Sequence, residues 1–256
     1  MRRRDLLVAA GSISLAGCVS DLTGSTTEEE SNPGNRSGDG EQPTIEGPAL
    51  AEQGRPTTIC EESIKPDGIR ALVEPAFGSP SEFPDDPDGY QPLADEQTII
   101  GIETAGEARA YPLTILDVHE IVNDALDGPM IVTYCPICRS GMVADRRIDG
   151  EVATFDVSGL LWRAPGINAA ANEKDDRVFS DREEGIGNNG NLVMYDSVTG
   201  SYWSQTLAQA ICGPMAEERL SVRPASTATW KEWRADHPDT EVLLPPPAST
   251  IVDPPV

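Results

Sequence analysis

The chain has 256 residues, with 43 acidic and 19 basic side chains and a formal net charge of -24. A surface this negative repels phosphate backbones and offers few of the lysine and arginine contacts on which nucleic-acid binding depends, so we exclude a nucleic-acid partner. Only three of the basic residues are lysines, and this acidic, arginine-biased composition indicates a halophilic protein adapted to salt.

The first residues are typical of an export signal. Residues 1–17 combine a basic start with an apolar stretch that is too short to span a bilayer. The segment RRDLL at 3–7 resembles a twin-arginine signal, and LAGC at 15–18 resembles a lipobox in which Cys18 receives the lipid. We therefore expect a lipoprotein that leaves the cytoplasm by twin-arginine export and is anchored by lipid on the extracellular face of the cell membrane.

Three further segments differ from the body of the chain in composition. Residues 18–59 begin with the lipidated cysteine and continue as an acidic stretch rich in Thr, Ser, Gly and Pro, which predicts a disordered tether. Residues 164–188 are polar and charged and predict an insertion loop within the globular domain, which we place at 60–244. Residues 245–256 predict a Pro-rich tail.

The globular domain is expected to be mainly β, of the α+β class: a single antiparallel β-rich domain with two or three short helices. Residues 130–134 predict a buried strand, and helices are expected at 112–118 and at 227–235, where Trp230 and Trp233 would pack on a sheet. Three hairpins are indicated by short apolar runs on both sides of turn residues: 98–102 with 108–111, 142–146 with 152–157 across Asp149 and Gly150, and 191–195 with 201–204.

Cys135 and Cys138 form a C-x-x-C motif at the end of the predicted strand 130–134. Two sulfurs at this spacing can bind one metal ion or close a readily reduced disulfide. Outside the cell a free dithiol oxidises, so we expect the pair to be metal-bound or disulfide-bonded. A thioredoxin fold is disfavoured, because the residues after Cys138 lead into a hairpin and not into a long helix.

His119 is the candidate third ligand, and Met194 or Met142 is a weak fourth. Two thiolates, an imidazole and a thioether suit copper better than zinc. Taken singly, each methionine is more typical of a core residue, and a lone histidine is more typical of a structural one. Supporting positions around the candidate site are expected for Glu120 or Asn123, which could orient the imidazole, and for Tyr134 and Trp203, which could form a wall.

Cys60 and Cys212 are isolated in the sequence. We expect them to form one long-range disulfide that joins the start of the domain to its late part. The motifs of serine hydrolases, phosphate loops, dinucleotide folds and zinc proteases are absent from the sequence.

Seven segments in this order resemble the domain-of-unknown-function family numbered 3179: KPDGIRALVEPAF at 65–77, GEARAYPL at 106–113, HEIVND at 119–124, YCPIC at 134–138, SGLL at 158–161, LVMYD at 192–196 and WSQ at 203–205. The resemblance covers about 65–244 and implies domain boundaries and a site, without a reaction. The site residues it implies are His119, Cys135, Cys138, Met194, Trp203 and Gln205. The chain differs from the family pattern at Val118, in the charged insertion, and in having Cys60 and Cys212.

Three hypotheses follow from the sequence. The first is an anchored metal protein, with copper favoured, that acts in electron transfer or metal handling and meets a redox or metal-transfer protein partner. The second is a thiol-disulfide oxidoreductase that uses Cys135 and Cys138. The third is a binding or structural module in which the C-x-x-C motif locks a turn. Enzymatic activity belongs to the second hypothesis alone, and the first is favoured.

Overall fold

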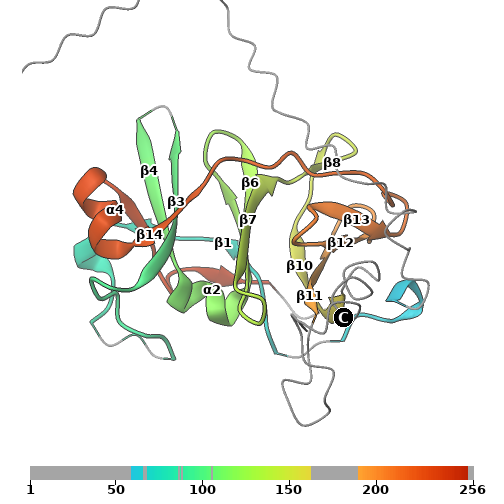
Figure 1. Ribbon diagram of the computed structural model, residues 1–256, viewed down its shortest axis with the longest axis horizontal. Coiled ribbons are helices and arrows are strands. Elements are labelled where there is room, and N and C mark those ends of the chain that lie inside the picture. The colour runs from blue at the N-terminus through green and yellow to red at the C-terminus, as the bar shows by residue number, and fades with distance from the viewer. Residues whose placement is uncertain are drawn as a thin grey trace, which may run out of the picture. The chain divides into compact units, whose positions relative to one another are not determined.

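The computed structural model describes residues 59–65, 68–85, 87, 89–104, 106–162 and 190–252 (Figure 1). This part is mostly β, with strands in three larger sheets and one small hairpin and with two seven-residue α-helices, which confirms the predicted fold class. Single-turn 3-10 helices, η1 (Ile59–Glu61) and η2 (Pro80–Glu82), lie near its start. The expected signal peptide, most of the tether and the insertion 164–188 lie outside the described residues.

The middle sheet has five strands and is buried on both faces. β1 and β5 are parallel, and the other neighbours are antiparallel. Because side chains alternate along a strand, Val122 and Val132 face one apolar cluster while Ile121 and Ile131 face another. In spatial order the strands are β16 (Thr250–Ile251), β1 (Leu72–Glu74), β5 (Ile121–Ala125), β6 (Pro129–Cys135) and β7 (Ser140–Asp145).

A second sheet packs on one face of the middle sheet through the cluster that contains Val122 and Val132. The helices α2 (Leu113–His119) and α4 (Trp230–Asp236) add side chains to this cluster, and α4 lies beside β14 in Figure 1. Thr229 and Glu232 form a capping box at the start of α4. In spatial order the strands are β14 (Ser226–Thr229), β3 (Thr98–Thr104), β4 (Glu107–Pro112), β15 (Glu241–Leu243) and β2 (Phe77–Gly78).

A third sheet packs on the opposite face of the middle sheet, through the cluster that contains Ile121 and Ile131. Its four strands pair antiparallel. Figure 1 shows the three sheets following one another across the view, with the middle sheet between the other two. In spatial order the strands are β10 (Phe155–Trp162), β11 (Asn191–Asp196), β12 (Tyr202–Ser204) and β13 (Gln209–Cys212).

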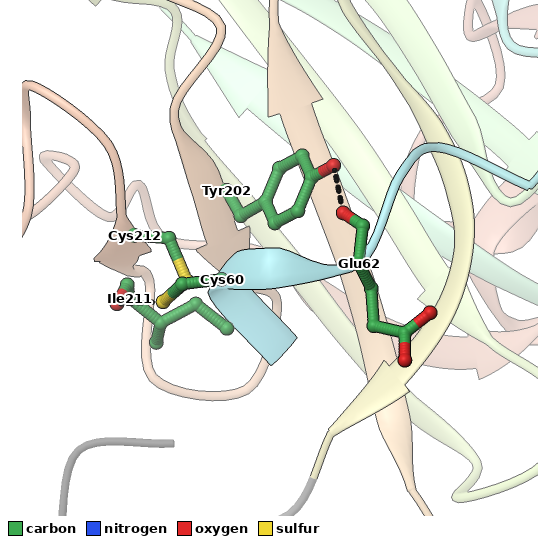
Figure 2. Close-up of a disulfide and its surroundings, with 5 residues drawn as sticks. All are labelled: Cys60, Glu62, Tyr202, Ile211 and Cys212. Atoms are coloured by element: carbon green, nitrogen blue, oxygen red, sulfur yellow. Dashed lines mark hydrogen bonds between the residues drawn. A yellow bond between two sulfur atoms is a disulfide. The ribbon is translucent and has the colours of Figure 1, made fainter. Parts of the chain in front are cut away.

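The predicted disulfide is present. Cys60 in η1 is bonded to Cys212 at the end of β13, across a sequence separation of 152 residues. Figure 2 shows the hydroxyl of Tyr202 donating a hydrogen bond to the Glu62 carbonyl oxygen beside it, at 2.8 Å. The Lys65 amide also donates to the Ser158 carbonyl oxygen in the third sheet, at 2.7 Å, so the start of the described chain is attached to that sheet by a covalent bond and by hydrogen bonds.

Several elements differ from the sequence-based expectations. The turn at Asp149 and Gly150 joins only β8 (Arg147–Ile148) and β9 (Glu151–Val152), because β7 and β10 continue into different sheets. Residues 227–229, expected to begin a helix, belong to β14, and α4 starts at Trp230. Within the expected tail, Thr250 and Ile251 form β16 and pair with β1.

Candidate functional site

The C-x-x-C motif lies at one end of the middle sheet, on the face turned toward the third sheet. Cys135 is the last residue of β6 and pairs in register with Ser140, the first residue of β7. The residues between them form a tight turn in which Arg139 has a left-handed backbone with φ of 51°. Alternation along β6 directs Cys135 and Ile131 to the same apolar cluster.

The two sulfurs differ in environment. Cys135 is fully buried, whereas Cys138 is half-buried in the turn. Both are free thiols, and their Sγ atoms are 2.7 Å apart. Burial, together with the hydrogen bond that its thiol shares with the Cys138 side chain, raises the pKa of the Cys135 thiol to about 11. Cys135 is therefore a protonated thiol at neutral pH, close to a more accessible partner.

A polar network from the third sheet surrounds the more accessible sulfur. Asn191, the first residue of β11, donates from Nδ2 to Cys138 Sγ at 3.2 Å and to Gln205 Oε1 at 2.7 Å. Gln205 is fully buried and donates to the Ser140 carbonyl oxygen at 3.0 Å and to Thr133 Oγ1 at 3.2 Å. Ser140 Oγ lies 3.6 Å from Cys138 Sγ and donates to Gln205 Oε1 at 3.0 Å. These contacts join the C-x-x-C turn to β11 and to the residue that follows β12.

Tyr134, next to the motif in sequence, is influenced by nearby charged groups. The pKa of Tyr134 is raised, first by burial and then by the negative charge of Asp117, and the nearby Arg139 opposes that rise. The same burial effect raises the pKa of Asp117 itself. Tyr134 is half-buried and packs against the apolar cluster that contains Val122 and Val132, on the face of the middle sheet opposite Cys135, so its role as a wall of the site stays a prediction.

His119 closes α2 and is engaged at both ring nitrogens. Its Nδ1 is 2.7 Å from the Arg70 carbonyl oxygen, and its Nε2 is 2.7 Å from the hydroxyl of Tyr90. A carbonyl oxygen can only accept, so Nδ1 must hold the proton and Nε2 must accept from Tyr90. Burial lowers the pKa of His119, which favours this neutral tautomer.

The residues expected to support the imidazole have other partners. Asn123 donates to the Leu72 and Phe155 carbonyl oxygens and accepts from the Phe155 amide, so it bridges β5 to β1 and β10. Glu120 follows α2 with φ of 57°, and its carbonyl oxygen accepts from the Tyr134 amide. The groups that orient the imidazole are therefore the Arg70 carbonyl and the Tyr90 hydroxyl, in place of Glu120 or Asn123.

Trp203 is a core residue of the third sheet. It is 1% exposed, donates from Nε1 to Asp196 Oδ2 at 2.9 Å, and packs edge-on against Phe155. Met194 pairs with Trp203 in register, and Met194 and Met142 both belong to the apolar cluster that includes Cys135 and Cys138. The structure thus places all four sulfur-bearing candidates on one side of the middle sheet.

The three expected metal ligands do not form one group. Across the described ranges, no three His, Cys, Asp or Glu side chains are placed so that they could hold a metal ion. In addition, both nitrogens of His119 already have hydrogen-bond partners. Two thiolates on one tetrahedral ion, each at about 2.3 Å, lie about 3.8 Å apart, so the sulfur separation of 2.7 Å fits disulfide chemistry better than chelation.

The family model described as "Protein of unknown function (DUF3179)" matches residues 66–168 and 183–250. The chain belongs to this family. The match contains both cysteines of the motif, His119, Met194 and Gln205, and its gap at 169–182 falls within the stretch expected to be an insertion. No curated protein and no solved structure has significant similarity to this DUF3179 chain. Within the part of the chain that is described, no helix is both long and apolar enough to cross a membrane.

Sequence reasoning missed two groups at this DUF3179 site, Ser140 and Asn191, and it missed the two partners of His119, Tyr90 and the Arg70 carbonyl. Ser140 and Asn191 carried a weak signal, since each is a polar residue at the start of an apolar strand. Asn191 is 53 positions from Cys138, and no local pattern relates the two. A contact to a backbone carbonyl such as that of Arg70 cannot be predicted from residue types, because every residue has a carbonyl group.

Proposed function

We propose that this protein exchanges disulfides with a partner protein through the Cys135 and Cys138 couple. The observation that supports this most is the pair of free sulfurs 2.7 Å apart in a short turn, with one sulfur half-buried and the other buried. A disulfide needs the two sulfurs at about 2.05 Å, so a small movement within the turn closes the bond. Oxidation of the pair removes two electrons and two protons, which reduce one disulfide of the partner to two thiols.

A redox titration of the full chain tests this proposal. The protein is equilibrated in graded glutathione or dithiothreitol buffers, its free thiols are alkylated, and peptides with the two cysteine pairs are counted by mass spectrometry. We expect Cys135 and Cys138 to be half-reduced between roughly -300 and -120 mV, the range of exchange proteins. The Cys60–Cys212 disulfide in the same sample is the internal control and should need a lower potential.

Two outcomes would contradict disulfide exchange. One is a Cys135–Cys138 pair that stays oxidised until Cys60–Cys212 is also reduced, as expected for a purely structural bridge. The other is a pair that never forms a disulfide in the most oxidising buffer. If Cys135→Ser then lowers stability without any other effect, the motif locks a turn in a structural or binding module.

We propose that the exchange takes place outside the cytoplasm, with the domain tethered through lipid on Cys18. The signal and lipobox in residues 1–18 support this, and the Cys60–Cys212 disulfide fits an oxidising compartment. Cys18→Ser is expected to release the domain from the membrane fraction into the medium, whereas Cys60→Ser should leave the anchored fraction attached. Retention of the Cys18→Ser variant in the membrane fraction would contradict a lipid anchor.

We propose copper(I) binding as a second candidate function, in electron transfer or metal handling. The observation that favours it is that Cys135, Cys138, Met142 and Met194 all belong to the large apolar cluster between the middle and third sheets, since thiolates and thioethers are the ligands that copper(I) prefers. Titration with copper(I) under reducing conditions should give one ion per wild-type chain and none for Cys135→Ser. His119→Gln is the matched control and should still bind one ion. Absence of stoichiometric copper in the wild type would rule this candidate out.

A further inference from the structure

The structure assigns different roles to the two sulfurs, and this inference rests on the proposed disulfide exchange. We propose that Cys138 forms the mixed disulfide with the partner and that Cys135 resolves it. We further propose that Asn191 is a positioning residue that orients the Cys138 sulfur. In this arrangement the second cysteine of the C-x-x-C motif receives the partner, and the first is held in the core.

Exposure separates the two cysteines. Cys138 is half-buried and lies between Ile137, which is 43% exposed, and the exposed Arg139. Cys135 is 0% exposed, because it ends β6 with its side chain in the apolar cluster between the middle and third sheets. Cys138 is therefore the more accessible of the two cysteines to a disulfide of another protein. The distance of 2.7 Å between the two Sγ atoms places Cys135 within reach of Cys138 for the resolving step.

The orientation of the Asn191 amide is fixed by its neighbours. Its Oδ1 accepts a hydrogen bond from the Thr206 amide at 2.8 Å, so the other end of the group must be the NH2. That NH2 donates to Gln205 Oε1 and to Cys138 Sγ. Gln205 is fixed in turn, because its Nε2 donates to the Ser140 carbonyl oxygen, which can only accept. An N–H donor is thus aimed at Cys138 Sγ and would stabilise negative charge there.

The exchange then has two balanced steps. In the first, the Cys138 thiolate attacks one sulfur of a partner disulfide; a bond from Cys138 to the partner forms, the partner's own S–S bond breaks, and its second sulfur leaves as a thiolate. In the second, Cys135 gives its proton to that thiolate and attacks Cys138 Sγ. The mixed disulfide breaks, and the partner leaves with both sulfurs reduced. Cys135 and Cys138 have then lost two electrons and are joined as a disulfide.

Trapping of the mixed disulfide tests the assignment of the two sulfurs. The full chain with Cys18→Ser, which removes the remaining unpaired cysteine, is prepared with either Cys135→Ser or Cys138→Ser and treated with oxidised glutathione. Mass spectrometry follows the glutathione adduct. We expect the protein that retains Cys138 to form the adduct at least about tenfold faster than the protein that retains Cys135. Equal rates, or a faster Cys135, would overturn the assignment.

Substitutions at Asn191 test its positioning role in the same Cys18→Ser, Cys135→Ser background. Asn191→Ala removes the donor, and Asn191→Asp keeps the acceptor for Thr206 while placing a negative oxygen toward Cys138 Sγ. The rate of Cys138 alkylation by iodoacetamide should fall in the order Asn191, Asn191→Ala, Asn191→Asp. The pH at which this rate increases should become higher in the same order. Gln97→Glu makes the same amide-to-carboxylate change beside a different sheet and should leave the rate unchanged.

The outcomes separate this inference from the proposed function. Thermal unfolding of each variant shows whether it folds. If Asn191→Asp does not fold, the pH profiles of alkylation for Asn191→Ala and Asn191→Ser decide whether Asn191 positions the sulfur. An unchanged pH profile in a folded variant without the amide overturns the role of Asn191. If wild-type protein exchanges disulfides and both single-cysteine proteins trap glutathione equally, the inference fails and the function stands. If the wild-type pair does not exchange at all, the function itself fails.

Discussion

At the scale of single residues, Asp124 joins two neighbouring side chains in the core. Its carboxylate accepts two hydrogen bonds from Arg109, at 2.9 and 3.1 Å, and one from the Tyr111 hydroxyl at 2.5 Å. Asp124→Asn removes the nearer and more buried of the two carboxylates beside the Arg109 guanidinium and leaves Glu241, at 3.5 Å, so we expect a loss of about 3 kcal/mol in the free energy of unfolding, measured in urea. The exposed pair Arg234 and Asp95 is the control, where Asp95→Asn should cost less than about 1 kcal/mol. Equal costs would contradict this account.

The neutral His119 makes stability depend on pH. Burial lowers the folded-state pKa of His119 below the usual 6.5, so below about pH 6.5 its imidazole binds a proton in the unfolded chain but stays neutral in the folded protein. Stability therefore falls as the pH falls through this window, by at most about 1.4 kcal/mol per pH unit for this group, until the folded-state pKa is reached. His119→Gln should lose less stability than the wild type between about pH 6.5 and about pH 5, measured by urea unfolding. Parallel pH curves would contradict the assignment.

Sequence alone identified the residues whose signal is local. Cys135 and Cys138 form a motif within four positions, and the Cys60–Cys212 bond followed because the remaining cysteines had no such neighbour. Asn191 reaches Cys138 only after the third sheet has packed on the middle sheet, so its contact is a product of tertiary structure. The same holds for the hydrogen bond between the Tyr90 hydroxyl and His119 Nε2, which occupies a nitrogen that a metal would need.

At the scale of elements, the turn residues predicted which neighbouring strands pair. The hairpins β3–β4 and β11–β12 are confirmed, since their turns are short and each strand meets its sequence neighbour. The parallel pairs β1–β5 and β4–β15 were beyond sequence reasoning, because each joins segments separated by long connections. The turn at Asp149 and Gly150 shows what turn residues do not predict. These residues predict the β8–β9 hairpin but not the different sheets that β7 and β10 join.

The packing of α4 on β3 depends on a glycine. A Cβ at Gly101 would lie 2.5 Å from the ring of Trp233, so Gly101→Ala must displace the indole. We expect a loss of about 2–3 kcal/mol in unfolding free energy. In a Trp233→Leu background the same substitution should cost clearly less, because the smaller side chain relieves the overlap. A cost that is the same in both backgrounds would show that the ring is not the cause.

At the scale of the whole molecule, the disulfide joins the first described residues to the third sheet. Closing a loop of this length restricts the unfolded chain, and loss of the bond is expected to cost about 2–5 kcal/mol. The double variant Cys60→Ser, Cys212→Ser should therefore unfold at lower urea concentration than the wild type while the Cys135–Cys138 pair keeps its redox behaviour. A changed potential for that pair would contradict the independence of the two sulfur sites.

The central claim is that the two cysteine pairs of this molecule have different chemistry. The most direct measurement is the fraction of each pair that is reduced, followed in one sample over a graded series of redox buffers. We expect Cys135–Cys138 to open and close reversibly at potentials where Cys60–Cys212 remains bonded. Reduction of both pairs together, or a C-x-x-C pair that never closes, would contradict it.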